Sequence, residues 1–491
     1  MTFLDWSICG GYLLLVAVQA WWFAGRQDSN EEYFVGRRRM GWPIVGVSLF
    51  ATNFSALSFV GLLREAVYED YHLLLAKFLV PAIVVPLVAW VFIPVFQRLQ
   101  LISAYEYLER RFDRRVRLCG SFFFSAYTLG WMGTMLYASA LLLQSSLDLS
   151  DSQLVWAVVL VGLFTTAYAA AGGVRAIIWT DVSQTLVLGG AVAAILLLAV
   201  NRIDGGLATV WSVGLEQGKL EMFDLRFDFA ARSNFYSACA YGIFVYLAHH
   251  AVSQSYVQRY AATPDVPSAR RALVLHGWMV AVISALFFLL GTTIFVYYQV
   301  HPVSAGQPLP ELAKQDQIAT HFVRKALAFP GLLGLLLAGL FTAMMSSIDS
   351  GVNNLTAVAT SDWLSGRDLS VRNSRLLCAL FGAAAVVTAL AVPVLGSNVF
   401  DVVMRLGGAL FGPLLGLFAL GVLSSRSNAP GALLGLLVGL LALAWAMQTD
   451  LSHWWYGAIT SVSTVAAGLT ASLAFPAPDS RKLEGLLFRP R

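Results

Sequence analysis

The sequence predicts an all-α polytopic membrane protein with about 13 transmembrane helices, and three observations support this prediction. Of the 491 residues, 58% are hydrophobic and only 12% are charged, and the mean hydropathy is +0.70. Apolar segments long enough to cross a bilayer recur along the whole chain. A few of these segments contain polar clusters near their middle, where polar groups are costly and usually functional. This composition excludes a soluble globular protein.

Thirteen apolar spans are expected, near residues 4–24, 42–65, 72–97, 117–146, 153–171, 175–201, 234–257, 271–299, 331–361, 374–396, 399–423, 429–448 and 454–475. The first is expected to be a retained helix, because Asp5 rather than a basic region precedes its apolar run. The four cysteines fall within spans and show no metal-type spacing, so free thiols are expected. The sequence contains no Walker A motif and no basic run interleaved with aromatic residues. An ATP-driven pump and a nucleic-acid-binding protein are therefore not expected.

The charges of the loops predict the orientation of the chain. Arginine and lysine collect in the loops on one side, including residues 26–39, 98–117 and the tail after 475. The opposite loops are acidic, uncharged or mixed. Since basic loops remain in the cytoplasm, the N-terminus is expected outside and the C-terminus inside.

The second span, 42–65, has a polar centre made of Thr52, Asn53, Ser55 and Ser58. Such centres are typical of discontinuous helices, whose freed carbonyl groups coordinate cations near the bilayer midplane. The alternative is an ordinary helix in which serine and threonine hydroxyls bond to their own backbone.

The sixth and ninth spans add further oxygen-bearing side chains. The ninth span carries Ser346, Ser347, Asp349 and Ser350, and hydroxyl oxygens with few full charges suit a monovalent cation such as sodium. The alternative is a small-residue packing face. In the sixth span, Asp181 is either a cation ligand or a carboxylate favoured by the helix dipole.

The seventh span, 234–257, is also polar in its second half. His249 and His250 point to different helix faces, so a shared metal is not expected, and Arg259 is interpreted as a charge anchor at the inner end. The polar centres of the second and seventh spans are five spans apart. This spacing is typical of two inverted five-helix repeats, each opening with a discontinuous helix.

Six motifs, taken together and in order, resemble the sodium:solute symporter family. They are Tyr33–Arg37, Ala51–Ala56, Tyr105–Phe112, Gly172–Val182, Val257–Arg259 and Met345–Ser350, and the resemblance covers residues 33–425. It implies a LeuT-like core of 5+5 inverted repeats. The expected division is an extra N-terminal helix in 1–30, a first repeat in 42–202, a second in 234–424, two extra helices in 429–475 and a cytoplasmic tail in 476–491.

The resemblance also implies two cation sites. One sodium would be held by the carbonyl groups of Ala51, Phe54 and Ala343 and by the hydroxyl groups of Ser346 and Ser347. Some relatives bind a second sodium, which here implies the set Asp181, Ser346, Asp349 and Ser350. Asp349 stands where a serine is expected in that arrangement.

The implied substrate-binding residues are Asn53, Ser55, Ser58, Ser253, Met404 and Arg405. Ser58, Ser253, Val280 and Met404 stand where sodium–galactose carriers use amide and lysine side chains. Losing those groups removes most of the hydrogen bonds that replace water around a sugar. Arg405 could clamp a carboxylate. Alternatively, it extends outward or pairs with Asp401.

These features favour a sodium-coupled symporter, and not an enzyme, that imports a small polar or anionic organic solute by alternating access. Sodium ions, the solute and the lipid bilayer are the expected partners, and a bacterial inner membrane is the expected location. Three alternatives stay open. They are proton coupling through Asp349 or Asp181, an intramembrane enzyme using His249, His250 and one of these aspartates, and a transport-like sensor.

Overall fold

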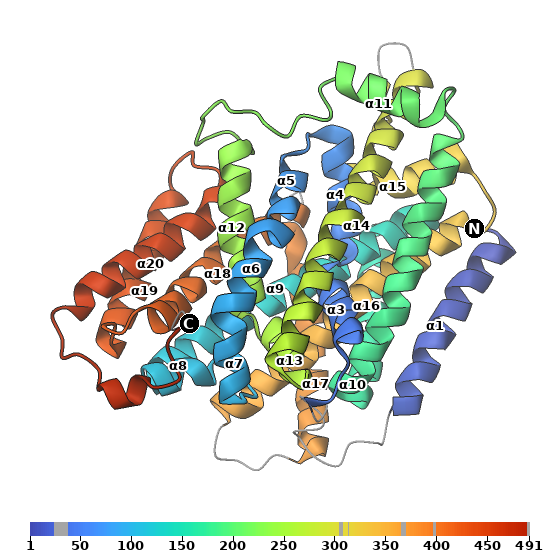
Figure 1. The fold of residues 1–491 in the computed structure, drawn as a ribbon. Helices are drawn as coiled ribbons and strands as arrows, with labels where there is room; N and C mark the ends of the chain where they lie inside the picture. Colours follow the sequence, from blue (N-terminus) through green and yellow to red (C-terminus); the bar gives the residue numbers. More distant parts are fainter. Residues whose placement is uncertain (24–37, 304–307, 313, 365–369, 396–398, 489–491) are drawn as a thin grey trace.

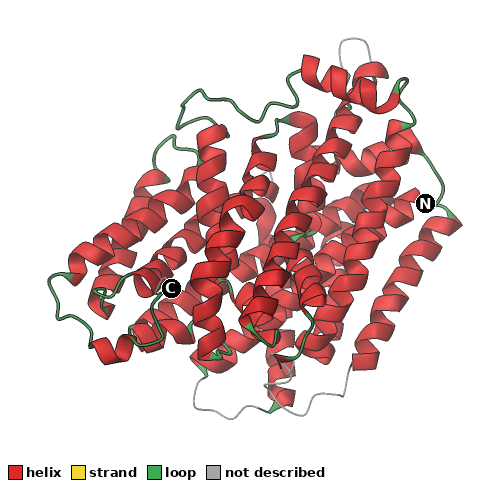
Figure 2. Cartoon of the chain, in the orientation of Figure 1, coloured by secondary structure: helices red, strands yellow, loops and turns green. Residues whose placement is uncertain are grey.

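The computed structural model describes residues 1–491 except 24–37, 304–307, 313, 365–369, 396–398 and 489–491. The described residues form helices joined by loops (Figure 2). In the first half of the chain, the helices are α1 (Phe3–Phe23), α3 (Trp42–Asn53), α4 (Ala56–Tyr68), α5 (His72–Leu79), α6 (Val85–Leu87), α7 (Ile93–Leu99), α8 (Glu106–Arg111), α9 (Arg114–Leu147), α10 (Asp151–Val200) and α11 (Gly206–Glu216). Two π-helical turns, η2 (Val80–Val84) and η3 (Val88–Phe92), link α5, α6 and α7.

In the second half, the helices are α12 (Phe235–Val252), α13 (Gln254–Ala262), α14 (Val266–Val300), α15 (Ile318–His321), α16 (Leu332–Val358), α17 (Val371–Leu395), α18 (Val399–Leu423), α19 (Ala429–Ala446) and α20 (Tyr456–Ser472). The π-helical turn η6 (Ala359–Trp363) extends α16. Figure 1 shows the long helices as one bundle, with α19 and α20 at one edge and α1 at the other.

In the part of the chain that the structure describes, most residues of the 13 predicted spans are helical, but the structure divides the spans differently. The spans 153–171 and 175–201 form one uninterrupted helix, α10, because the three residues between them are too few for a separate loop. Among the described residues, eight helices are long and apolar enough to cross a membrane, and the bent pair α3–α4 makes a ninth. The number of 13 crossings therefore remains a prediction.

Side-chain caps fix where several long helices begin. Asp113 accepts a hydrogen bond from the backbone N–H of Val116 at the start of α9, and Asn234 does the same for Ser237 at the start of α12. A capping residue satisfies one of the N–H groups that the first turn leaves without a partner. Polar loop residues thus set the ends of helices whose interiors are almost entirely apolar.

Helix α16 lies at the centre of the bundle. In its most apolar 18-residue stretch, 94% of the residues are buried, against 28% for the peripheral helix α17. It contacts α10, α9, α1, α17, α3 and α4. Its first turn is tied to α1 by Asp5, whose carboxylate accepts a hydrogen bond of 2.9 Å from the N–H of Gly334. The polar residues of α16 therefore lie far from lipid, where only protein groups or a bound ion can satisfy them.

Two of the predicted spans are broken in the middle. Between α3 and α4 the chain leaves helical geometry at Phe54 and Ser55, and the two halves are bent by 61°. Between α12 and α13, Ser253 is extended, with φ −71° and ψ 133°. The discontinuous helices predicted from the polar centres are therefore present in the structure.

Candidate functional site

The break between α3 and α4 exposes backbone carbonyl groups inside the bundle. The carbonyl of Phe50 still accepts a hydrogen bond from the N–H of Phe54, at 2.9 Å. The carbonyl of Ala51 does not have the usual partner, because the N–H of Ser55 is directed to Ser58 instead. Ser55 occupies the position before the first residue of α4, and its backbone N–H donates to the hydroxyl of Ser58 at 3.3 Å. Thr52 donates back to the carbonyl of Ser48 at 2.9 Å, so the alternative of backbone-bonded hydroxyls applies to this one residue.

Helix α16 presents two hydroxyl groups to this break. The hydroxyl of Ser346 lies 3.1 Å from the carbonyl oxygen of Ala51 and 3.1 Å from that of Ala343. The hydroxyl of Ser347 donates to the same Ala343 carbonyl at 3.1 Å. These groups and Phe54 are all buried. Four of the five oxygen atoms predicted as sodium ligands are thus brought together by one hydrogen-bond network, and Phe54 follows at the break itself.

A second buried polar cluster joins α3, α10, α13 and α16. Asp181 Oδ2 accepts hydrogen bonds from Ser48 Oγ at 2.5 Å and from Arg259 Nη2 at 3.1 Å. The same Arg259 nitrogen donates to Ser350 Oγ at 2.8 Å, and Ser350 donates to Asp349 at 3.3 Å. Asp181 Oδ1 has no hydrogen-bond partner in the part of the chain that the structure describes.

The interpretation of Arg259 as an anchor at the inner end of the span was wrong. Its side chain is 1% exposed and forms an ion pair with Asp181 inside the bundle. The break at Ser253 explains this position, because α13 begins a new helix that directs Arg259 inward.

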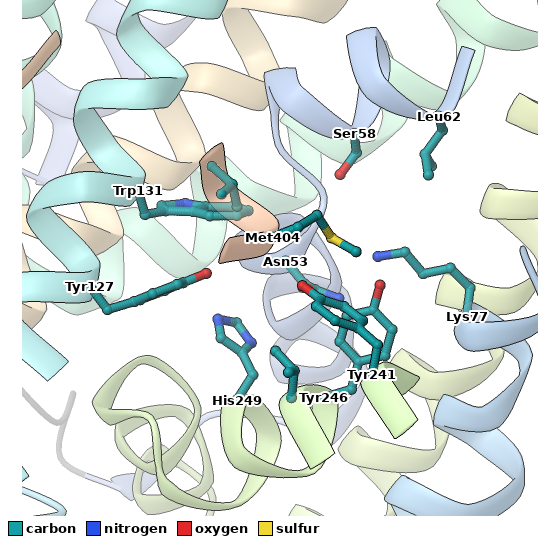
Figure 3. Close-up of a pocket in the computed structure, with 12 residues that line it drawn as sticks. Asn53, Ser58, Leu62, Lys77, Tyr127, Trp131, Tyr241, Tyr246, His249 and Met404 are labelled. Carbon is teal, nitrogen blue, oxygen red and sulfur yellow. The ribbon is translucent and has the colours of Figure 1, made fainter. Parts of the chain in front are cut away.

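A cavity of about 50 Å³ lies beside the same break (Figure 3). Of the six predicted substrate-binding residues, Asn53, Ser58 and Met404 line it. Ser253 instead lines a smaller neighbouring cavity, and Ser55 is buried at the break without lining either of them. The other lining residues are Leu62, Lys77, Tyr127, Trp131, Tyr241, Val245, Tyr246, His249 and Val403.

Arg405 does not have the position that a carboxylate clamp in the cavity would need. Arg405 is exposed and does not line the cavity, whereas Met404 beside it is buried and does. One residue along a helix turns the side chain by about 100°. Asp401 lies 3.2 Å from Arg232 of the loop before α12. The alternative in which Arg405 extends outward is therefore the one that its exposure supports.

The smaller cavity connects the two polar regions. It is lined by Thr52, Ser253, Ser255, Ser347, Ser350, Gly351 and four aromatic or polar residues of α9, and it shares Tyr127, Trp131 and His249 with the larger cavity. Its hydroxyl-bearing residues come from α3, α9, α16 and the α12–α13 break. Asn53 lines the larger cavity and Thr52 lines the smaller one together with Ser347, so the broken turn borders both cavities.

The two adjacent histidines have different surroundings, as their positions on the helix predict. His249 lines both cavities, whereas His250 is bonded to the carbonyl of Tyr246 at 2.6 Å and to the ring of His276 at 2.8 Å. Among the described residues, no group of three or more histidine, cysteine or acidic side chains could hold a metal ion.

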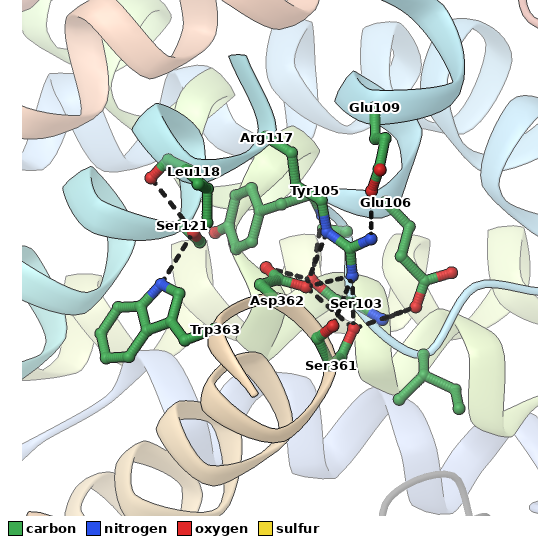
Figure 4. A network of polar contacts seen from close by, with 12 residues as sticks. Ser103, Tyr105, Glu106, Glu109, Arg117, Leu118, Ser121, Ser361, Asp362 and Trp363 are labelled. Carbon is green, nitrogen blue, oxygen red and sulfur yellow. Dashed lines mark hydrogen bonds and ion pairs between the residues drawn. The ribbon is translucent and has the colours of Figure 1, made fainter. Parts of the chain in front are cut away.

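An ion-pair network ties α9 to the end of α16 on the side of the arginine-rich loops (Figure 4). Arg117 donates to Asp362 from Nε at 3.0 Å and from Nη2 at 2.6 Å, and it also bonds Glu109 and Ser361. Ser103 donates to Asp362 at 3.0 Å. The network therefore joins the loop before α8 to η6 and closes this end of the bundle.

Replacing Asp362 with asparagine is expected to lower the melting temperature of the purified protein. The side chain of Asp362 is fully buried, so its loss leaves the guanidinium of Arg117 without its buried carboxylate. Breaking a buried pair by removing one partner costs about 3–5 kcal/mol. Glu106→Gln is the control, because Glu106 lies at the partly exposed edge of the network. An unchanged melting temperature for Asp362→Asn would contradict this role.

At the opposite end, His453 precedes α20 and lies 3.9 Å from Asp401. Burial lowers its pKa from 6.5 to about 4, and the negative charge of Asp401 opposes this shift. The unfolded chain thus takes up the proton near pH 6.5, whereas the folded protein does so only near pH 4. His453 is therefore expected to reduce stability progressively as the pH falls through this interval, by up to about 3 kcal/mol.

His453→Gln tests this expectation, because glutamine keeps a polar side chain but does not titrate. Melting temperatures of the wild type and the variant should converge near pH 7 and differ in favour of the variant at pH 5. Parallel pH profiles for the two proteins would show that another group causes the acid sensitivity.

Comparisons with known proteins agree with this geometry. A model of the sodium:solute symporter family matches residues 33–439. The sodium/sialic acid symporter NanT of Aliivibrio fischeri is 33% identical over 94% of this chain and 92% of its own length. The solved structure of a Na⁺-coupled sialic acid symporter in a substrate-bound outward-open state superposes with a TM-score of 0.89, at 30% identity, over 97% of this chain and 99% of its own.

A more distant structure supports the fold alone. Mhp1, a nucleobase–cation symporter, superposes with a TM-score of 0.57 at 16% identity, covering 94% of this chain and 98% of its own. The all-helical architecture with two broken helices is therefore the LeuT-like fold that the sequence predicted. Together, the fold, the broken helices and the match over residues 33–439 show that this chain belongs to the sodium:solute symporter family.

Proposed function

We propose that this protein uses the inward flow of sodium to import a small organic solute across a bacterial inner membrane. The observation that carries the proposal is the contact between the freed carbonyl of Ala51 in α3 and the hydroxyl of Ser346 in α16, beside the hydroxyl of Ser347. Carbonyl and hydroxyl oxygens are hard ligands that replace the hydration shell of a small cation. The family membership and the sodium-coupled relatives support the same activity.

The sodium ligands would be the carbonyl oxygens of Ala51, Phe54 and Ala343 and the hydroxyl oxygens of Ser346 and Ser347. The fit is good because Ser346 already bonds two of these carbonyls. A sodium ion placed between the Ser346 hydroxyl and the carbonyls of Ala51 and Ala343 would accept lone pairs from all three oxygens. The hydroxyl hydrogen would then point away from the ion. Because the ligands belong to two different helices, binding of sodium would hold α3 against α16.

A second sodium is proposed at Asp181, with Ser346, Asp349 and Ser350 as further ligands. The unpartnered Oδ1 of Asp181 supports this position, because a buried carboxylate oxygen without a donor calls for a water or an ion. Arg259 holds the other oxygen of the same carboxylate, so it would balance charge when the site is empty.

The solute would bind in the cavity lined by Asn53, Ser58 and Met404. Sodium and solute would then lie on the two sides of the same broken turn, which gives a physical route for coupling. By linkage, sodium should tighten solute binding by the factor by which the solute tightens sodium binding. Rocking of one half of the bundle against the other would expose both ligands to the cytoplasm.

The proposed arrangement in the membrane follows the loop charges. Two inverted repeats, 42–202 and 234–424, would each open with a broken helix, and the N-terminus would face outward. The breaks at Phe54–Ser55 and at Ser253 support the pairing of the repeats.

Uptake into sealed vesicles tests the proposed function. The purified protein is reconstituted, and candidate solutes are offered with an inward gradient of sodium or of choline. Accumulation only with sodium is expected. Accumulation that is equal with both cations, or that follows a proton gradient instead, would overturn sodium coupling.

A further inference from the structure

Lys77 of α5 places a cation in the solute cavity. Its side chain is 7% exposed and extends from the helix into the space between Ser58, Asn53 and Met404 (Figure 3). The ammonium nitrogen lies 4.6 Å from the centre of the Tyr246 ring. A single lysine near the start of an apolar span is normally an interfacial anchor, so the inward position of Lys77 is unusual.

The surroundings of Lys77 differ from those of the other buried cations. In the part of the chain that the structure describes, Arg64, Arg111 and Arg259 are the other buried arginine and lysine residues. Arg64 and Arg259 form ion pairs with carboxylates, and Arg111 donates to three backbone carbonyls. Lys77 has the ring face of Tyr246, and none of the described carboxylates lies within ion-pair distance of it.

A buried ammonium group without an anion is costly, and a ring face offsets only part of the lost hydration. The cost is removed when an anion enters the cavity. The cavity also contains an unused hydrogen-bond donor, because Nδ2 of Asn53 is buried and has no acceptor among the described residues. The cavity thus offers a positive charge and an unused donor, and none of the described residues that line it is a carboxylate. This combination complements a negatively charged group.

The size and the walls of the cavity narrow the class of solute. Its volume of about 50 Å³ accommodates a few non-hydrogen atoms, since about 10–15 Å³ of such space holds one water. Apart from its polar groups, it is walled by aliphatic, aromatic and sulfur-containing side chains, namely Leu62, Trp131, Val245, Val403 and Met404. Such walls suit a short apolar body.

We propose that Lys77 is the anion-binding residue of this cavity, and that the solute is a small monocarboxylate with an apolar body. The carboxylate would accept hydrogen bonds from Lys77 and from Asn53, whose neighbour in the chain, Thr52, faces the second cavity next to Ser347. This inference rests on the proposed symport function and adds the charge of the solute to it. It also replaces Arg405 with Lys77 as the group that selects for charge.

Thermal stability of the purified protein, in sodium and in choline, tests this inference with matched probes. Propionate and pyruvate are each compared with the corresponding neutral amide, which has almost the same shape. Ligands that bind the folded state raise the melting temperature. For the wild type in sodium, at least one carboxylate is expected to stabilise and its amide is not.

The variant Lys77→Met keeps the length of the side chain and removes the charge. It is expected to be at least as heat-stable as the wild type without ligand, because a buried charge is lost. Its dissociation constant for the carboxylate should rise at least about tenfold, the factor expected from losing one charge-assisted hydrogen bond. Lys219→Met is the matched control, because Lys219 also lies 4.6 Å from a ring, that of Phe295, but outside the cavity.

Different outcomes would overturn the role of Lys77 and the proposed symport function. In one outcome, sodium alone stabilises the protein while carboxylate and amide bind equally, and in another, sodium alone stabilises it while no carboxylate binds. Either result would leave the sodium site in place and would overturn the role of Lys77. Unchanged carboxylate affinity in Lys77→Met would overturn it as well. Absence of any sodium effect in the wild type would overturn the symport function instead.

Discussion

Replacing Ser346 and Ser347 together with alanine is expected to raise the sodium concentration for half-maximal uptake by at least about 100-fold. The double variant removes two of the five proposed ligand oxygens. Even residues that only support a metal ligand are worth roughly 10- to 100-fold in affinity, so the loss of direct ligands should have at least this effect. Sodium-dependent uptake in vesicles, measured across a wide range of sodium concentrations, checks this expectation.

The same variant should fold. Both hydroxyls are bonded to carbonyl groups of their own helix or of α3, so their removal costs only about 1–3 kcal/mol for the carbonyls that lose a donor. The matched control is Ser139→Ala with Ser146→Ala, which removes two buried hydroxyls of α9 that bond carbonyls four residues back. Normal sodium affinity in a folded Ser346–Ser347 variant would remove the proposed site.

Replacing Arg259 with methionine is expected to be among the most destabilising single changes in this chain. Arg259 and Asp181 are 1% and 0% exposed, so methionine would leave a buried carboxylate without its partner. Removing one member of such a pair costs about 3–5 kcal/mol. The guanidinium also donates to Ser48 and Ser350, so three helices lose a shared contact. The melting temperature in detergent measures the effect.

A second substitution shows whether the charge pair causes the loss. Adding Asp181→Asn to Arg259→Met removes the unpaired charge, and it should recover part of the lost stability, as expected for residues that interact directly. Arg324→Gln is the exposed control, because its partner Asp148 lies at the surface and the change should be nearly neutral. Additive losses in the double variant would mean that the two charges do not stabilise each other.

If Asp181 also holds a second sodium, that sodium and the guanidinium of Arg259 compete for the same carboxylate. Sodium would then protect Arg259→Met from unfolding more than it protects the wild type. Equal protection of both proteins by sodium would argue for a single sodium at the Ser346–Ser347 site.

The broken helices could be predicted from the sequence, because their cause is local. A run such as Thr52–Asn53–Phe54–Ser55 places polar side chains where an apolar helix should continue, and a polar centre in a span needs a cavity to satisfy it. The pairing of Ala51 with Ser346 could not be read from spacing. It came from resemblance to a family, and the 3.1 Å contact agrees with it.

The charged residue that faces the solute cavity could not be predicted from the local sequence. Arg405 and Met404 are neighbours in the sequence, and only the rotation of α18 decides which of them faces the cavity. Lys77 lies a few residues inside an apolar span, and its sequence position alone does not show which way its side chain points. The packing of α5 against α12 turns it inward, over the ring of Tyr246.

The sequence by itself determined the all-helical membrane architecture, the two broken spans and the family, because hydropathy, polar centres and motif order are properties of the chain alone. Only the tertiary structure decided that Arg259 pairs with Asp181 and that Lys77, rather than Arg405, is the cation in the cavity. The physical reason is that the surroundings of a charged side chain depend on which helix packs against it. Asp181 and Arg259 are 78 positions apart in the chain and meet only when their helices pack.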